Sequence, residues 1–116
     1  MTRTLILALL FAGPATATEW PTKPEDIPLS PEELDALAGQ TFTFYDDGQA
    51  AFSAGGAYSY TYASGDAAFG TYSIAEDGSV CIAYRNGFSR CDLYVRSGGR
   101  LVLIDEKGDR YPVRPE

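Results

Sequence analysis

Alternation of apolar and polar residues dominates the chain from residue 40 onward. A period of two is typical of strands that bury one face of a sheet. Asp-Gly, Asn-Gly and Gly-Gly pairs, which favour tight turns, separate the alternating segments. The segments that we expect to form strands are 41–45, 50–53, 58–62, 68–74, 79–84, 88–95, 101–104 and 110–113. The pattern therefore predicts a mainly β domain.

The turns between these segments are short, so neighbouring strands should pair antiparallel as an up-and-down meander. An open meander leaves two unpaired edges, whereas a closed barrel leaves none. We therefore predict a small barrel of roughly eight strands, with an open and strongly curved sheet as the alternative arrangement.

One short helix is predicted before the strands, over residues 30–39. Ser30 is a good N-cap, Pro31 suits the first helical position, and Glu33 completes a capping box. Gly39 is placed to end the helix in the left-handed conformation. The side chains expected to pack on the sheet are Leu34, Leu37 and Ala38. A helix of this length needs that packing, because it would not persist alone in water.

The N-terminus has the pattern of a secretory signal peptide over residues 1–17, with an apolar run at 5–12 and a cleavage site after Ala17. The alternative, a membrane anchor, needs about 20 apolar residues. Residues 18–29 are rich in Pro and should form an extended lead without regular structure. Residues 30–116 form the single β-barrel-like domain, which we expect in the periplasm, with no membrane span after cleavage.

Charge and composition exclude several functions. The net charge is −7 for the whole chain and −8 once Arg3 is removed with the signal peptide. Such an acidic protein does not fit nucleic acid or anionic membranes as partners. The chain has no His, which is the commonest general base and a common metal ligand. We expect no enzyme activity, no cofactor and no metal site, and we interpret the acidic Asp-Gly segments as plain turns.

The two cysteines, Cys81 and Cys91, flank an Asn-Gly turn. A three-residue loop there pairs Tyr84 with Phe88 and brings Cys81 opposite Cys91. In a non-hydrogen-bonded pair the Cα atoms approach to about 4.5 Å, which a disulfide accepts. A redox-active pair or a metal site fits this spacing less well. The sequence therefore predicts a disulfide across one hairpin.

Aromatic residues supply the best candidates for recognition. Tyr58, Tyr60 and Tyr62 alternate strictly, so they share one face of a predicted strand. Tyr offers contact area with a polar tip at low entropy cost. We predict a monomeric binding domain that recognises a small ligand or a cell-envelope component through this face, although core filling would also explain the aromatic content.

A resemblance to a known family rests on five short segments. These are Leu37–Thr41, Asp47–Gly48, Gly70–Tyr72, Gly78–Cys81 and Arg90–Cys91. Together they resemble a family of small exported proteobacterial domains of unknown function, with a Leu-x-Gly-Asn-Thr opening, a Gly-Thr-Trp strand and a Cys pair. The resemblance implies a periplasmic β-rich domain and implies no activity.

A second resemblance lies in residues 53–58, where Ser53, Gly55, Gly56 and Tyr58 form a Ser-Gly-x-x-Tyr-like segment. It is similar to the inhibitory loop of periplasmic inhibitors of c-type lysozyme, which are small eight-stranded barrels. The resemblance implies an alternative function, a proteinaceous inhibitor of a basic enzyme such as lysozyme. The acidic charge of the chain would steer it toward such a partner.

Overall fold

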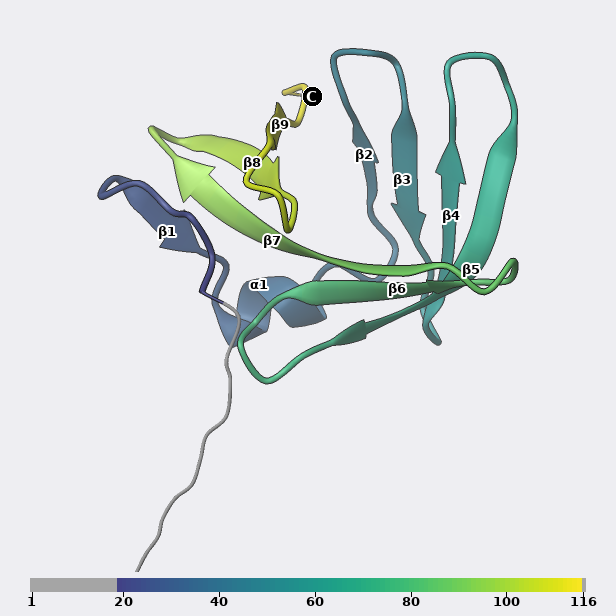
Figure 1. The fold of residues 1–116 in the computed structure, drawn as a ribbon, viewed down its shortest axis with the longest axis horizontal. Helices are drawn as coiled ribbons and strands as arrows, with labels where there is room; N and C mark the ends of the chain where they lie inside the picture. Colours follow the sequence, from purple (N-terminus) through teal and green to yellow (C-terminus); the bar gives the residue numbers. More distant parts are fainter. Residues whose placement is uncertain (1–18, 116) are drawn as a thin grey trace, which may run out of the picture.

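The computed structural model describes residues 19–115, so the predicted signal peptide and its cleavage site after Ala17 lie outside the described residues. In this part of the chain a helix and nine strands follow one another (Figure 1). They are β1 (Asp26–Pro28), α1 (Pro31–Asp35), β2 (Thr41–Thr43), β3 (Gln49–Phe52), β4 (Ala57–Thr61), β5 (Ala67–Ile74), β6 (Val80–Tyr84), β7 (Ser89–Ser97), β8 (Arg100–Ile104) and β9 (Arg110–Pro112). Within the described residues, no helix has the length and apolar character needed to cross a bilayer.

The eight strands β2 to β9 are neighbours in chain order, and every adjacent pair is antiparallel. The predicted meander is confirmed. It curls into a half-barrel (Figure 1), the shape that lets one face of a small sheet enclose a core. The two ends of the meander meet at a bridge between Phe44 and Val113, where the Arg114 N–H donates to the Thr43 carbonyl at 2.7 Å.

The start of the helix follows the predicted capping box. The Glu33 N–H donates to Ser30 Oγ at 3.2 Å, and the Ser30 N–H donates to Glu33 Oε1 at 3.0 Å. Arg96 on β7 also donates to Glu33, at 2.9 Å. These contacts satisfy N–H groups that the first helical turn leaves free, and they fix α1 against the sheet.

The end of the helix differs from the prediction. Regular α-helix stops at Asp35, and a turn continues to Gly39, whose φ of +90° is the expected left-handed conformation. Leu34 and Leu37 are buried as predicted, but Ala38 is exposed. The burial prediction for Ala38 was wrong because the chain leaves the helical path before it reaches that residue.

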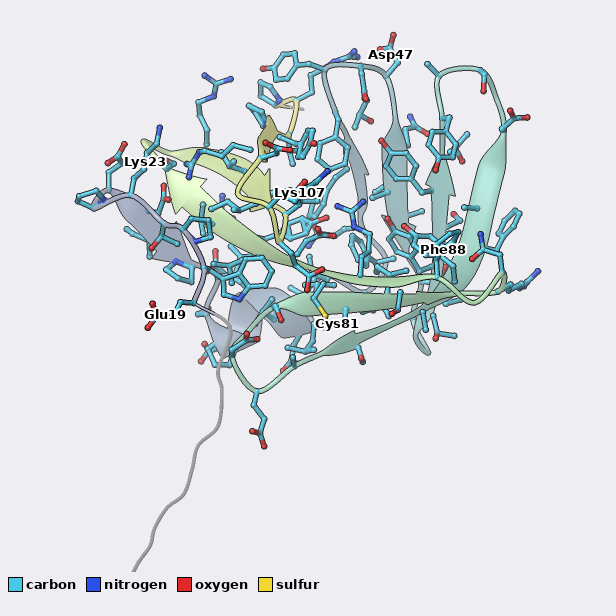
Figure 2. The ribbon with its side chains drawn as sticks, in the orientation of Figure 1. Glu19, Lys23, Asp47, Cys81, Phe88 and Lys107 are labelled. Carbon is cyan, nitrogen blue, oxygen red and sulfur yellow. A yellow bond between two sulfur atoms is a disulfide. The ribbon has the colours of Figure 1, made fainter. Side chains whose placement is uncertain are left out.

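The core lies on both faces of the sheet. An inner cluster fills the concave side and includes Phe42, Phe52, Ile82 and Tyr94, together with the two buried leucines of the helix region. Figure 2 shows side chains gathered on this side, between the strands β2–β4 and β7–β9. The convex side carries a smaller outer cluster, consisting of Leu93, Val95, Val102 and Ile104. The strands β7 and β8 are therefore buried on two faces.

The Pro-rich lead is extended, but it is not without structure. Its strand β1 pairs antiparallel with the end of β7, and Trp20 packs against the outer cluster. The Trp20 Nε1–H donates to Asp77 at 3.0 Å. Arg110 on β9 holds Asp26 with two hydrogen bonds of 2.9 Å, and the Asp26 carboxylate is fully covered. The lead docks on the sheet because Trp20 packs on the outer cluster and these polar contacts hold the lead in place.

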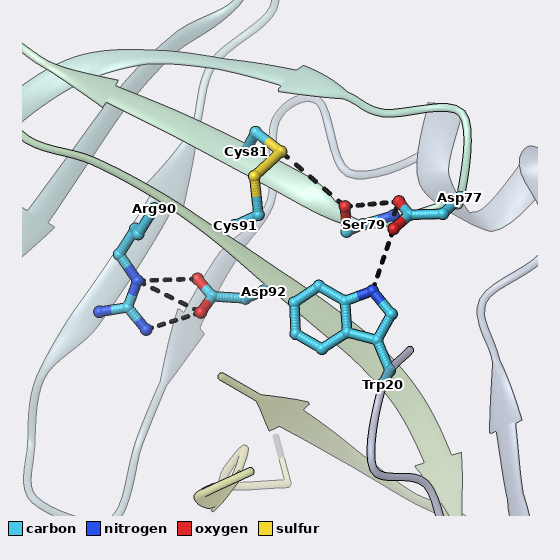
Figure 3. The surroundings of a disulfide bond; sticks show 7 residues. All are labelled: Trp20, Asp77, Ser79, Cys81, Arg90, Cys91 and Asp92. Carbon is cyan, nitrogen blue, oxygen red and sulfur yellow. Dashed lines mark hydrogen bonds and ion pairs between the residues drawn. A yellow bond between two sulfur atoms is a disulfide. The ribbon is translucent and has the colours of Figure 1, made fainter. Parts of the chain in front are cut away.

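The predicted disulfide between Cys81 and Cys91 is confirmed, with an S–S distance of 2.08 Å and a Cα–Cα distance of 4.0 Å. The register of β6 and β7 is the one that a three-residue loop requires, with Ile82 opposite Arg90 and Val80 opposite Asp92. Both sulfurs lie on the convex side, near Trp20 (Figure 3). The inward-facing residues of the same two strands form part of the site described next.

Candidate functional site

A cavity of about 420 Å³ opens on the concave side of the half-barrel. Six of the eight tyrosines of the chain line it: Tyr45, Tyr58, Tyr60, Tyr62, Tyr84 and Tyr111. Its size lies within the roughly 300–1,000 Å³ of small-molecule pockets. Tyr45 and Asp46 of the β2–β3 turn line the cavity, so it opens beside that turn. The α1 helix lies at the other end of the half-barrel (Figure 1).

Three tyrosines stand around the entrance of the cavity, and they come from three separate parts of the chain. Tyr45 lies in the β2–β3 turn, Tyr62 follows β4, and Tyr111 belongs to β9. Their exposed fractions are 53%, 52% and 43%. Large aromatic side chains that stay this exposed while they surround a cavity offer flat surfaces to a ligand.

An ion pair lies at the wall formed by β7. Arg90 Nε donates to both carboxylate oxygens of Asp92, at 3.1 and 3.2 Å, and Nη2 donates to Oδ1 at 2.7 Å (Figure 3). Asp92 is buried, with 7% of its side chain exposed, whereas 43% of the Arg90 side chain is exposed. Burial disfavours the charge of Arg90, but the hydrogen bonds and charge of Asp92 outweigh it and raise the Arg90 pKa. Arg90 therefore carries a positive charge beside the cavity.

The deeper tyrosines remain protonated at neutral pH. Burial raises the pKa of Tyr58 well above its ordinary value, and nearby Tyr84 adds to the effect. Burial also raises the pKa of Tyr60, as does the charge of Asp46. The Tyr58 and Tyr84 rings pack edge to face at 6.1 Å, and those of Tyr60 and Tyr62 do so at 5.0 Å. These hydroxyl groups can both donate and accept hydrogen bonds.

Two glycines make room for this arrangement. Gly70 pairs with Tyr58 on one side and with Tyr84 on the other. A Cβ atom at Gly70 would collide with the carbonyl oxygen of Ala83, so only Gly allows the two strands to approach this closely. A Cβ atom at Gly48 would collide with the Tyr60 hydroxyl. The absence of two side chains thus shapes the cavity wall.

The structure separates the residues that the sequence grouped as candidates. Tyr58, Tyr60 and Tyr62 all line the cavity. Ser53, Gly55 and Gly56 lie in the β3–β4 turn at the opposite end of the half-barrel, beside the turn that follows α1. The Gly56 N–H donates to the Ser53 carbonyl within this turn at 3.1 Å. The two candidate groups therefore belong to different surfaces, and the inhibitor interpretation stays a prediction.

Ten residues line the cavity besides Tyr58, Tyr60 and Tyr62, and four of these ten that bear on its chemistry were not predicted as site residues from the sequence. The sequence could have placed Arg90 and Asp92 on one common face, because the disulfide register and a period of two put both opposite the sulfurs, but it does not indicate that this face lines a cavity. Tyr45 and Tyr111 could not be placed together, because they are far apart in sequence and only the curl of the sheet brings them together. The partner of Arg90 lies two residues along the same strand rather than on a neighbouring strand.

No group of three or more His, Cys, Asp or Glu residues in the described part of the chain is arranged to hold a metal ion. No protein-family model matches the chain, and neither a curated protein nor a solved structure matches it. The two resemblances drawn from short segments therefore stay predictions. The function is therefore inferred from the geometry of the cavity.

Proposed function

We propose that this domain binds a small ligand in the tyrosine-lined cavity, without catalysis, after export to the periplasm. The observation that carries the proposal is the gathering of Tyr45, Tyr62 and Tyr111, all about half exposed, around a cavity with an ion pair in its wall. A pocket with apolar surfaces and a few convergent polar groups is typical of ligand binding. The disulfide is compatible with an oxidising compartment.

The carboxylates of the cavity are not arranged for a catalytic step. Asp46 and Asp92 both line it, and a pair of carboxyl groups can hydrolyse a glycosidic bond. One member of such a pair must deliver a proton. Burial raises the pKa of Asp92, although the hydrogen bonds and charge of Arg90 oppose that rise. The Asp92 carboxylate accepts three hydrogen bonds from Arg90, and Asp46 is exposed and accepts the Gly48 N–H at 2.9 Å. Neither is placed as a general acid.

The proposal is tested by amide NMR spectra of the mature chain with a panel of five small-molecule probes. The panel contains a neutral disaccharide (diacetylchitobiose), a uronic acid, an amino acid, tetramethylammonium and the apolar N-phenylnaphthylamine. We expect at least one probe to shift the amides of residues 45–48 and 60–62. Tyr62→Ala should weaken that binding, because it removes one wall of the entrance.

The matched control is Phe69→Ala on β5. Phe69 is also aromatic and about half exposed, but it does not line the cavity. The control should bind the probe as the unmodified chain does. The proposal fails if all five probes leave the spectra unchanged, or if both variants lose binding equally.

A further inference from the structure

We infer that the ligand class is a neutral saccharide of one or two rings, held by hydroxyl hydrogen bonds to the Arg90–Asp92 pair and by a ring face lying on the entrance tyrosines. This inference rests on the proposed function, because it takes the cavity as the binding site. It names the chemistry that the polar, aromatic and charged groups of the cavity share.

The polar contribution comes from unused hydrogen-bonding capacity. Arg90 engages Asp92 through Nε and Nη2, and no hydrogen bond from Nη1 to the described part of the chain is present. The Asp92 carboxylate has more lone-pair directions than the bonds from Arg90 occupy. A charged donor and a charged acceptor thus lie side by side. Two neighbouring hydroxyl groups of a sugar ring match this arrangement, because each can donate and accept.

The aromatic contribution comes from the entrance. A sugar ring has an apolar face of C–H groups and a polar circumference of hydroxyl groups. Tyr45, Tyr62 and Tyr111 present rings with hydroxyl tips, which contact the first and hydrogen-bond the second. A wholly apolar ligand would use the rings but would leave the Arg90 donors without acceptors, which is unfavourable once water is displaced.

The charges that line the cavity favour a neutral ligand over an anion or a cation. The cavity lining contains Asp46 and Asp92 against a single cation, Arg90, and the whole chain has a net charge of −7. An anionic ligand would meet this excess of negative charge. A cationic ligand would approach the guanidinium of Arg90, which is 43% exposed and positively charged. A neutral ligand meets neither cost.

Size limits the ligand further. A cavity of about 420 Å³ lies in the lower part of the range for small-molecule pockets. It is large enough for one or two sugar rings, and a longer chain would have to extend past the entrance. Diacetylchitobiose is a suitable probe, because it is neutral and its amide oxygens add acceptors for Arg90.

The same five-probe panel, followed by calorimetric titration, tests the inference. We expect diacetylchitobiose to bind more tightly than the uronic acid, tetramethylammonium and N-phenylnaphthylamine. Arg90→Lys keeps a positive charge beside Asp92 but removes the planar fork. It should weaken disaccharide binding by about tenfold, the effect of one lost charge-assisted hydrogen bond. Binding of N-phenylnaphthylamine, which offers no acceptor to the guanidinium, should weaken less than binding of the disaccharide.

A second measurement, on the unmodified chain, tests the same inference if the Arg90→Lys variant does not fold. In the unmodified chain, the guanidinium NMR signals of Arg90 should shift when the disaccharide is added, and those of Arg85 on the outer surface should not. Preferential binding of an ionic or apolar probe at the cavity, or a silent Arg90 signal, overturns the saccharide inference while the binding function stands. If no probe binds, the proposed function itself fails. Release of monosaccharide would overturn the proposal of binding without catalysis.

Discussion

Replacing both Cys81 and Cys91 by Ser removes the cross-link between β6 and β7 while the hairpin sequence otherwise stays the same. The disulfide joins residues separated by 10 positions. The chain-entropy relation gives about 2.7 kcal/mol at 25 °C for a loop of this length. In a domain of this size, 1 kcal/mol corresponds to about 4–8 °C in Tm, so the variant should melt about 10–20 °C lower.

Urea unfolding followed by Trp fluorescence measures this loss. Trp20 is the single Trp of the sequence and packs on the outer cluster near the disulfide, so its emission reports the docking of the lead on the sheet. The m-value should rise in the variant, because the unfolded chain without the cross-link exposes more surface. The unmodified protein reduced with dithiothreitol is the matched control and should lose the same stability. A Tm that falls by less than about 4 °C in the variant would refute the entropic reasoning.

The same variant separates stability from binding. Cys81 and Cys91 point to the convex side, whereas their neighbours Ile82 and Arg90 point inward. Below its melting temperature, the Cys81→Ser, Cys91→Ser protein should therefore bind any cavity probe with unchanged affinity. Loss of binding by the folded variant would show that the cavity depends on the cross-link.

Three further changes test the packing of the lead and the sheet. Trp20→Ala should lower the free energy of unfolding by about 2–3 kcal/mol, measured by urea unfolding followed by circular dichroism. This is less than the roughly 3–5 kcal/mol for a fully buried Trp, because the indole is half-buried. An unchanged free energy of unfolding would mean that the lead does not dock. The Arg110 hydrogen bonds hold the pKa of Asp26 well below its ordinary value, so the stability that Asp26 supplies is complete above about pH 4 and is lost as the pH falls below that. Asp26→Asn should flatten this acid loss in Tm measured from about pH 5 to pH 2, and an unaltered acid profile would contradict the assignment. Gly70→Ala should destabilise the protein by about 1–3 kcal/mol through overpacking, whereas Thr71→Ala beside it, on the exposed face, should change stability by less than about 0.5 kcal/mol.

Local rules explain what the sequence predicted well. The capping box at Ser30 and Glu33 depends on residues three positions apart, and its geometry follows from helix ends alone. The pairing of Cys81 with Cys91 follows from counting back from one turn. The common face of Tyr58, Tyr60 and Tyr62 follows from the period of two in a strand.

Other features depend on contacts between distant residues. Strand β1 contains Pro28, which is unfavourable in most strands, and its partner β7 lies nearly 70 residues further along the chain. The entrance of the cavity combines a turn, a strand end and the last strand of the meander. No periodicity indicates which face of the sheet becomes concave, so the sequence could not show that Arg90 and Asp92 lie beside the tyrosines.

The last described residues lie next to the cavity. Pro112 lines it, the Arg114 side chain pairs with Asp47 in the β2–β3 turn, and Figure 1 shows the C-terminus beside that turn. The lead that begins at Glu19 runs instead over the convex side. An affinity tag or a sensor surface coupled behind Pro115 would therefore crowd the opening through which a ligand enters. Immobilisation through the other terminus leaves that opening facing the solution.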